Sequence, residues 1–373
     1  MLLGGRGQMS KPGHPYISGA PQIYDRTTTS TIIWHVVLCL LPAAGWGMYI
    51  FGINAVRIVF TAVFTAVAVE GVIGLLLKRF TLYDGSAFLS GLLIGMMLPP
   101  TVPLYIPILA SLFAMAVVKG SFGGLGRNWM NPALAGWAFV YLSFSDQMHQ
   151  WVYPGMVREV DAMTRATPLR LVKTSILLGR AEGSSPMEIL SSAGFPRSLM
   201  DGAWTTWLNS HILEPLGISL PPGYIDLFFG FIPGAIGETS ALLLLIGTVV
   251  LIGKKILPWE VPVSFFTVFC GLTAVFGGLP FGGGWVAGDV LFQLFSGGIL
   301  LGVFYMATDL VTSPLTRMGL VIYGMGIGLL TFLIRLYGGY AEGIGFSILF
   351  MNVFVPLINK CATSGSRVEK KPI

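Results

Sequence analysis

Ten long apolar segments, separated by short polar loops, are the feature that most restricts how this chain can fold. Each approaches the roughly 20 residues that an α-helix needs to cross the hydrocarbon core of a bilayer. Five precede and five follow a polar stretch at 147–225. The pattern predicts an all-α polytopic membrane protein of about ten transmembrane helices, at 31–51, 55–77, 86–100, 104–119, 132–146, 239–257, 260–277, 286–307, 318–337 and 341–358.

The composition favours the membrane class and argues against others. Apolar residues make up 54% of the chain and charged residues only 10%, with a mean hydropathy of +0.77. The net charge of +5 comes from short basic groups between apolar segments, which indicates membrane topology and no nucleic-acid partner. Cys39, Cys270 and Cys361 form no CxxC or His-rich group, so no metal site is expected from them.

The distribution of Lys and Arg predicts the orientation. With the N-terminus inside, fourteen of these residues fall in inner loops and tails, and the short outer loops hold only Arg57 and Arg335. Short basic loops stay in the cytoplasm, so both termini are predicted to be cytoplasmic. The chain then divides into an N-terminal segment 1–30, a five-helix half 31–146, an extracytoplasmic loop 147–225, a second half 226–358 and a basic tail 359–373.

An odd number of helices in each half makes the second half run in the opposite sense, so two inverted five-helix repeats are expected. Internal similarity supports this architecture. The segment FLSGLLIG at 88–95 resembles LFSGGILLG at 294–302, and each lies in the third predicted helix of its half. Glycine-rich helices are common in membranes, and this is the alternative explanation of the similarity.

Gly and Pro interrupt three apolar regions, at 96–103, 231–240 and 309–316. Irregular backbone at membrane depth is tolerated where it is buried in protein or lines a cavity, so these breaks are candidates for a central site. Glu238, Thr239 and Ser240 would open a half-helix whose free amides could hold an anionic group. The alternative is an ordinary helix N-cap with an acidic residue nearby.

Four ionisable residues fall within or at the ends of predicted helices: Glu70, Asp289, Asp309 and His35. A charged side chain in the bilayer costs about 2.5 to 3.5 kcal/mol on insertion scales, so such residues are functional candidates. We hypothesise an ion pathway through Glu70, Asp309 and Asp289. The alternatives are a structural carboxylate for Glu70 and a turn-capping role for Asp309. For His35, a packed and hydrogen-bonded ring is preferred to proton transfer.

No catalytic residue is predicted from the common motifs, because the chain lacks G-x-S-x-G, P-loop, HExxH and dinucleotide signatures. One polar segment, DAMTRATPLR at 161–170, carries three charged residues, two threonines and one proline. Threonine often caps helices, and proline is common in turns and at helix starts. From the residues alone the segment is a helix-capping loop outside the membrane.

Seven sequence blocks resemble a known family: LLPA (40–43), DGSAFLSGLLIGMMLPP (84–100), FGGLGRNWMNPALAG (122–136), DAMTRATPL (161–169), IPGAIGETS (232–240), MATDLVTSPLT (306–316) and RLYGGYAEGIGFSILFMNVFVPLI (335–358). On these blocks the chain is similar over its whole length to the D subunit of the Rnf complex, the ion-translocating ferredoxin:NAD oxidoreductase, and more distantly to the B subunit of the sodium-pumping NADH:quinone reductase. The resemblance implies ten helices in two inverted repeats, similar to the urea transporter fold.

The resemblance also implies a covalent FMN. The family joins this cofactor through a phosphoester to a threonine in a D-x-x-[S/T]-x-A-T motif, which here comprises Asp161, Thr164, Ala166 and Thr167, with Thr167 as the attachment residue. A hydroxyl is the atom that a phosphoester needs. Threonine is a weak nucleophile at its ordinary pKa, so a separate flavin transferase is the expected partner.

The resemblance implies a membrane component of a redox-driven pump that passes electrons between ferredoxin and NAD, coupled to Na⁺ or H⁺ movement. Implied partners are a small flavinylated subunit, membrane subunits A and E, and soluble iron–sulfur subunits B and C, in a bacterial or archaeal cytoplasmic membrane. A second, non-covalent flavin such as riboflavin is a further candidate. The alternative is a channel or secondary transporter for a small polar solute, since one scaffold can host both functions.

Overall fold

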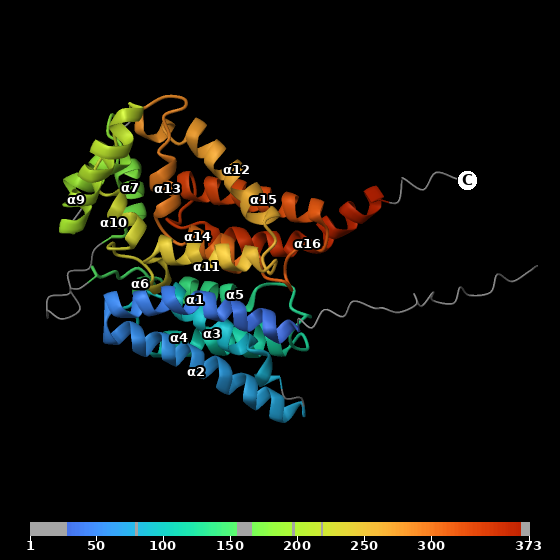
Figure 1. Cartoon of the computed structure of the whole chain (residues 1–373). Helices are drawn as coiled ribbons and strands as arrows, with labels where there is room; N and C mark the ends of the chain where they lie inside the picture. Colours follow the sequence, from blue (N-terminus) through green and yellow to red (C-terminus); the bar gives the residue numbers. More distant parts are fainter. Residues whose placement is uncertain (1–27, 79–80, 155–165, 196–197, 218, 367–373) are drawn as a thin grey trace, which may run out of the picture.

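The computed structural model describes residues 28–78, 81–154, 166–195, 198–217 and 219–366. Every regular element in these ranges is a helix. Figure 1 shows α1 to α5 along one side of the molecule and α11 to α16 along the other; most of these helices run lengthwise, whereas α13 runs across the bundle. The helices α7, α9 and α10 gather at one end of this bundle, and α1 begins and α16 ends at the opposite end.

The first half of the chain forms five apolar segments. They are α1 (Thr29–Phe51), α2 (Ile53–Leu76), α3 (Ser86–Met97), α4 (Tyr105–Leu112) with the π-helical turns of η2 (Phe113–Gly120), and α5 (Pro132–Ser143). Side chains start these helices where the sequence provides a cap. Thr28 accepts a hydrogen bond from the amide of Thr31, and Asn131 accepts from the amides of Ala133 and Leu134.

The second half contains the remaining apolar helices. They are α11 (Ala241–Gly253), α12 (Glu260–Phe276), α13 (Val290–Phe295), α14 (Ile299–Leu301) with the π-helical η8 (Gly302–Met306), α15 (Arg317–Leu336) and α16 (Ile344–Ser366). Five helices, α1, α2, α12, α15 and α16, are long and apolar enough to cross a membrane by length and composition. Four shorter apolar helices accompany them, at 86–97, 105–120, 132–143 and 241–253. The chain is therefore a polytopic, multi-pass membrane protein.

Several predicted helix bounds differ from the structure; the last helix, for example, runs to Ser366 and not to 358. We expected a single helix over 286–307, but it is interrupted between Phe295 and Ile299. Ser296 is extended, and Gly297 adopts φ +72°, a left-handed conformation that favours glycine. The three breaks expected from Gly and Pro are confirmed, because 98–104, 231–235 and 307–316 lie outside the helices. The glycine pair at 297–298 adds a further break in the second half.

A single apolar core joins both halves of the chain. It includes Leu40 from α1, Ile94 from α3 and Phe265 from α12, all fully buried. The outer surfaces of the long helices remain apolar. Phe60 and Phe64 on α2 are 66% and 76% exposed, as is typical of side chains that face lipid tails.

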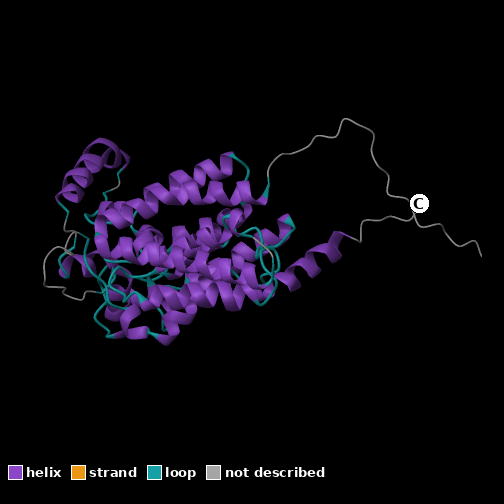
Figure 2. Ribbon diagram, turned by 90° about the horizontal axis from the view of Figure 1, so that it is seen from below, coloured by secondary structure: helices purple, strands orange, loops and turns teal. Residues whose placement is uncertain are grey.

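The polar stretch after α5 folds into short helices with a core of its own. They are α6 (Ser145–Met148), α7 (Pro168–Leu177), α8 (Pro186–Ser192), α9 (Leu199–Leu208) with η4 (Asn209–Leu213) and η5 (Glu214–Leu216), and α10 (Tyr224–Phe229). Their second core contains Leu169, Val172 and Leu190, and it also takes in Phe292 of α13. Figure 2 shows the long helices lying alongside one another, with the loops between them at the ends of the bundle.

Candidate functional site

Polar and charged side chains gather at both ends of the helix bundle. The first group surrounds Thr167, which is the N-cap of α7. Its Oγ1 accepts a hydrogen bond from the amide of Arg170 at 3.2 Å, and the side chain is only 6% exposed. Pro168 follows at the first helical position, where a missing N–H is tolerated. The capping role expected from the residues is thus confirmed for Thr167.

A small pocket of about 20 Å³, with room for roughly one water molecule, lies beside Thr167. Tyr141 lies 4.8 Å from Trp137, measured between ring centroids, and its hydroxyl is 2.9 Å from Nε2 of His149. Aromatic walls with a few polar groups are the usual lining of a site for a planar ring. The residues around Thr167 in this pocket are Met97, Trp137, Tyr141, Met148, His149, Trp151, Arg170, Ala341 and Glu342.

These features fit the phosphate end of a flavin mononucleotide, and the aromatic side chains would contact its ring once they move apart to widen the pocket. A phosphoester at Thr167 would place its anionic oxygens at the N-terminus of the ten-residue α7, where the helix dipole favours negative charge. Arg170 supplies a cation at the rim of the same pocket. Ala166 directly precedes Thr167, whereas Asp161 and Thr164 of the expected motif lie outside the described residues.

The segment around Glu238 does not form the open anion site that one hypothesis expected. Ser240 is the N-cap of α11 and accepts from the amide of Leu243 at 3.3 Å, as in the alternative interpretation. Thr239 donates its hydroxyl hydrogen to the carbonyl of Ile236 at 3.1 Å. The carboxylate of Glu238 accepts from the amide of Ala235 at 3.2 Å. An acidic side chain therefore occupies the position in front of the helix.

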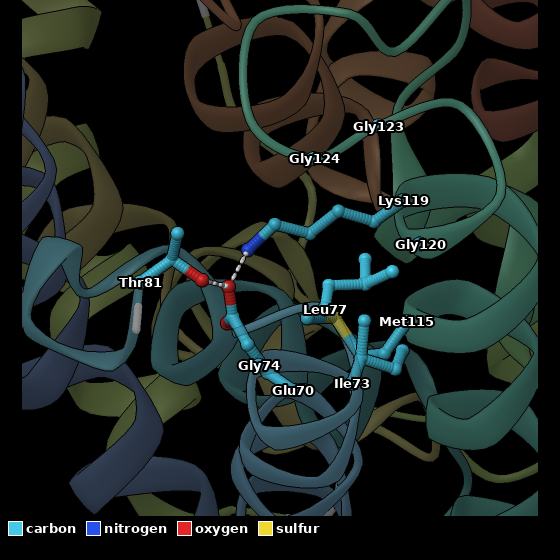
Figure 3. Close-up of a pocket in the computed structure, with 10 residues that line it drawn as sticks. All are labelled: Glu70, Ile73, Gly74, Leu77, Thr81, Met115, Lys119, Gly120, Gly123 and Gly124. Carbon is cyan, nitrogen blue, oxygen red and sulfur yellow. Dashed lines mark hydrogen bonds and ion pairs between the residues drawn. The ribbon is translucent and has the colours of Figure 1, made fainter. Parts of the chain in front are cut away.

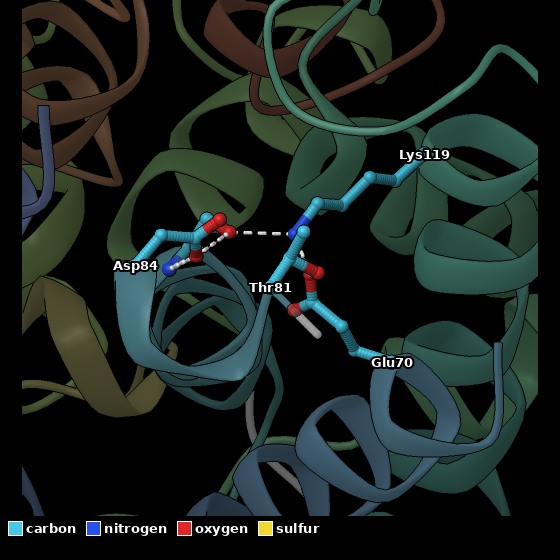
Figure 4. Close-up of polar contacts among 5 residues, drawn as sticks. Glu70, Thr81, Asp84 and Lys119 are labelled. Carbon is cyan, nitrogen blue, oxygen red and sulfur yellow. Dashed lines mark hydrogen bonds and ion pairs between the residues drawn. The ribbon is translucent and has the colours of Figure 1, made fainter. Parts of the chain in front are cut away.

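The second group lies at the other end of the bundle, around Glu70. Lys119 extends its Nζ to 2.5 Å from Oε1 of Glu70, and both side chains are 5% exposed (Figure 3). Thr81 donates to the same carboxylate oxygen at 2.7 Å. Lys119 also donates to Oγ of Ser86 at 2.5 Å, and Ser86 donates in turn to Asp84 (Figure 4). This chain of contacts joins two carboxylates through one ammonium and one hydroxyl.

Glu70 has one oxygen without a partner. Among the described residues its Oε2 is buried and makes no hydrogen bond. Glu70 lines a pocket of about 70 Å³, roofed by the loop that carries Gly123 and Gly124 (Figure 3). A buried, charge-assisted carboxylate with free acceptor capacity can take a proton or a metal cation. The position of Glu70 suits the ion-pathway hypothesis and also explains the residue as a paired structural carboxylate.

Asp309 and Asp289 lie apart from each other and from Glu70. Asp309 sits in the turn after η8, where Thr312 donates to its carboxylate at 3.0 Å. Asp289 is the N-cap of α13, accepting from Phe292 N at 2.9 Å and from the hydroxyl of Tyr224 at 2.5 Å. The contacts of both residues match capping roles. Asp309 also borders a cavity with Lys119 and Asn131 near the Glu70 end.

His35 is hydrogen-bonded, as expected. Its Nδ1 lies 2.7 Å from the carbonyl of Thr31, and its Nε2 lies 3.1 Å from Nζ of Lys254. Sequence reasoning missed Lys119, whose position at the end of an apolar segment looked like a topology signal. It also missed His149, whose partners Tyr141 and Ser145 are nearby in the sequence, and Glu342, whose partners are distant in the sequence.

The fold and these sites define a class: a multi-pass membrane protein with paired ionisable groups at one end of the bundle and an aromatic pocket beside a helix-capping hydroxyl at the other. The chain belongs to the NQR2, RnfD, RnfE family, whose sequence profile matches residues 16–366.

Named relatives narrow this further. The chain is 39% identical to the D subunit of the proton-translocating ferredoxin:NAD(+) oxidoreductase complex of Clostridium ljungdahlii, over 92% of this chain and 93% of the relative. It is 38% identical to the D subunit of the Na(+)-translocating ferredoxin:NAD(+) oxidoreductase complex of Acetobacterium woodii, over 92% of each. It is 36% identical to the D subunit of the ion-translocating oxidoreductase complex of Stutzerimonas stutzeri, over 93% and 95%. The relatives thus share the oxidoreductase name but differ in the ion named.

Proposed function

We propose that this chain is the membrane component of a redox-driven ion pump and carries FMN covalently on Thr167. The observation that carries the proposal is the position of the Thr167 hydroxyl, which caps α7 and opens on an aromatic pocket. When bound, the isoalloxazine would supply one- and two-electron chemistry. The protein would hold the phosphate at the start of α7, and the aromatic side chains that line the pocket would contact the ring.

The names of the relatives support the wider assignment. If this chain is the D subunit of an Rnf complex, it takes part in electron transfer between ferredoxin and NAD. The other membrane, flavinylated and iron–sulfur subunits of the complex would act with it. The architecture we propose is ten membrane segments in two inverted repeats of five, with α3 of the first half corresponding to the interrupted α13 and α14 of the second. We place the helices α7 to α10 outside and both termini in the cytoplasm of a bacterial or archaeal cell.

Ion movement would use the carboxylates at the cytoplasmic end. Glu70 is the strongest candidate because it is buried, is paired with Lys119, has one oxygen without a partner among the described residues and lines a pocket. Asp309 borders a neighbouring cavity with Asn128 and Asn131, whose polar lining also suits a second, non-covalent flavin such as riboflavin. Replacing Glu70 with Gln and measuring ion uptake in vesicles tests the route. Unchanged uptake would remove Glu70 from it.

The attachment of flavin has a direct test. The full chain would be produced with a flavin transferase, denatured, separated on a gel and viewed under ultraviolet light. We expect a fluorescent band and an intact mass that includes FMN, lost in Thr167→Ala and kept in Thr164→Ala. A dark wild-type band would overturn the redox assignment and favour a solute channel or transporter on the same scaffold.

A further inference from the structure

The break between α13 and α14 brings three charged side chains from distant parts of the chain against two glycines. A methyl group added at Gly298 would lie 2.9 Å from Oε1 of Glu238. One added at Gly297 would lie 3.0 Å from Nη2 of Arg335 and 3.4 Å from Cγ of Glu342. The absence of side chains at 297 and 298 therefore makes room for two carboxyl groups and one guanidinium.

Arg335 is held mainly by backbone carbonyls. Its Nη1 donates to the carbonyl of Gln293 at 2.6 Å, and its Nη2 donates to the carbonyl of Ser296 at 2.9 Å. The side chain is 3% exposed, and its Nε has no hydrogen-bond partner in the described part of the chain. These contacts fix one positive charge beside the glycine pair, with one donor still unused.

The two carboxyl groups lie against neighbouring residues, Glu238 at Gly298 and Glu342 at Gly297, and are close enough to interact directly. Ionised carboxylates are acceptors only, so a bond between Glu238 and Glu342 needs one proton. With that proton in place, a single negative charge remains, and Arg335 balances it. Without the proton, two negative charges would share a buried site with little water. Because this is unfavourable, one member of such a carboxyl pair keeps its proton.

This pair also reaches the pocket beside Thr167. Glu342 lines that pocket, as do Tyr141 and His149. His149 Nδ1 lies 2.6 Å from the carbonyl of Ser145, an acceptor, so Nδ1 carries a hydrogen and Nε2 is free to accept from Tyr141. The charged and titratable groups that face the pair are Arg335, His149, Tyr141 and Arg170.

We propose that Glu238 and Glu342 form a proton-binding site that holds one proton between them and exchanges it with the Thr167 pocket through Glu342. The site itself depends only on the contacts of this chain. Its role in compensating charge placed in the pocket rests on the proposed function. In that role, when the complex's one-electron carriers add one electron to a flavin in the pocket, Glu342 would give it one proton. The pair would then be fully ionised until a proton from water replaced the one transferred.

The proton site is tested on flavin-free protein, so that its outcome does not depend on cofactor attachment. Thr167→Ala chain would be examined by infrared spectroscopy at neutral pH in H₂O and D₂O. We expect a deuterium-sensitive carbonyl band of a protonated carboxyl that is weakened by Glu238→Gln and by Glu342→Gln. The control is Glu182→Gln, on an exposed residue, which should keep the band. An unchanged band in both pair variants would overturn the proposal.

Two measurements guard against a folding defect and test the link to the pocket. Because Gln resembles the protonated acid, either single Gln variant should unfold at nearly the wild-type temperature at neutral pH. Strong destabilisation of both would count against a shared proton. In flavinylated protein, the midpoint potential should depend less on pH in Glu342→Gln than in Glu182→Gln. Equal dependence would overturn exchange with the pocket.

Discussion

The ammonium of Lys173 donates a hydrogen bond to the backbone carbonyl of Tyr340 at 2.5 Å, which ties α7 to the loop before α16. A second bond, to the carbonyl of Ile334, is 2.9 Å long. Lys173 belongs to the helix that begins at Thr167, and Tyr340 is two residues from Glu342. One lysine therefore holds the candidate attachment residue and the candidate proton site in a fixed relation.

This lysine gives the fold a pH dependence. Burial, followed by the nearby charge of Arg335, lowers the pKa of Lys173 from 10.5 to about 8. Between these values the unfolded chain binds a proton that the folded chain has released, so stability should rise with pH from about 8 to 10.5. Below about pH 8 both states carry the charge, and the full cost of burying it in the folded chain remains.

The measurement is the thermal unfolding midpoint across that pH range, compared with Lys173→Met. The unfolding midpoint of the wild type minus that of the variant should increase as the pH rises. Arg180→Met, which removes an exposed cation from the same group of helices, should follow the wild-type profile. A difference that stays constant with pH would contradict a lowered pKa of Lys173.

Capping and cofactor attachment at Thr167 can be separated. Thr167→Asn keeps an N-cap oxygen but has no hydroxyl, so it should fold with near wild-type stability and show a dark band. Thr167→Ala should show a dark band and lose about 1 kcal/mol of stability. Thr167→Ser should retain the cap and allow attachment. In-gel fluorescence and thermal unfolding together decide the matter, and fluorescence in Thr167→Asn would contradict attachment at this residue.

The pair of Glu70 and Lys119 should be coupled energetically. Lys119→Met leaves a buried carboxylate without its cation, which costs about 3 to 5 kcal/mol in comparable buried pairs. Adding Glu70→Gln removes the unpaired charge, so the double variant should recover most of the loss. A double-mutant cycle on thermal unfolding measures the coupling. Additive effects of the two substitutions would show that the pair contributes nothing beyond its separate members.

The sequence predicted those parts of the fold that depend on local pattern. Apolar runs located the long helices, and the Gly and Pro clusters located three of the breaks. Thr167 could be assigned a cap because Pro168 follows it directly. These signals lie within a few residues of the features that they specify.

Features that depend on contacts between distant residues could not be read in this way. Lys119 meets Glu70 across 49 positions, and Glu342 meets Glu238 across a break that the sequence did not reveal. The helices of 166–229 were read as a polar loop, because their small core is completed by Phe292 and other residues from the membrane half. Each case needs the tertiary fold before its partner is known.

The break around Ile236 depends on a glycine in α1, and this dependence can be tested with a matched neighbour. A methyl group at Gly47 would lie 2.0 Å from the carbonyl oxygen of Ile236, whereas one at Gly45 would have nothing within 4 Å. Gly47→Ala should therefore lower the free energy of unfolding by about 1 to 3 kcal/mol, the usual effect of overpacking. Gly45→Ala should be neutral or stabilising by up to about 1 kcal/mol, since Ala favours helix. Thermal unfolding of the two variants in the same detergent measures the difference.

Because the amide of Ile236 is also bonded to the carbonyl of Leu98 at 3.2 Å, displacement of the backbone at Ile236 would disturb α3 as well. Equal stability of the two variants would show that the backbone at Ile236 can move away from α1 at little energetic cost.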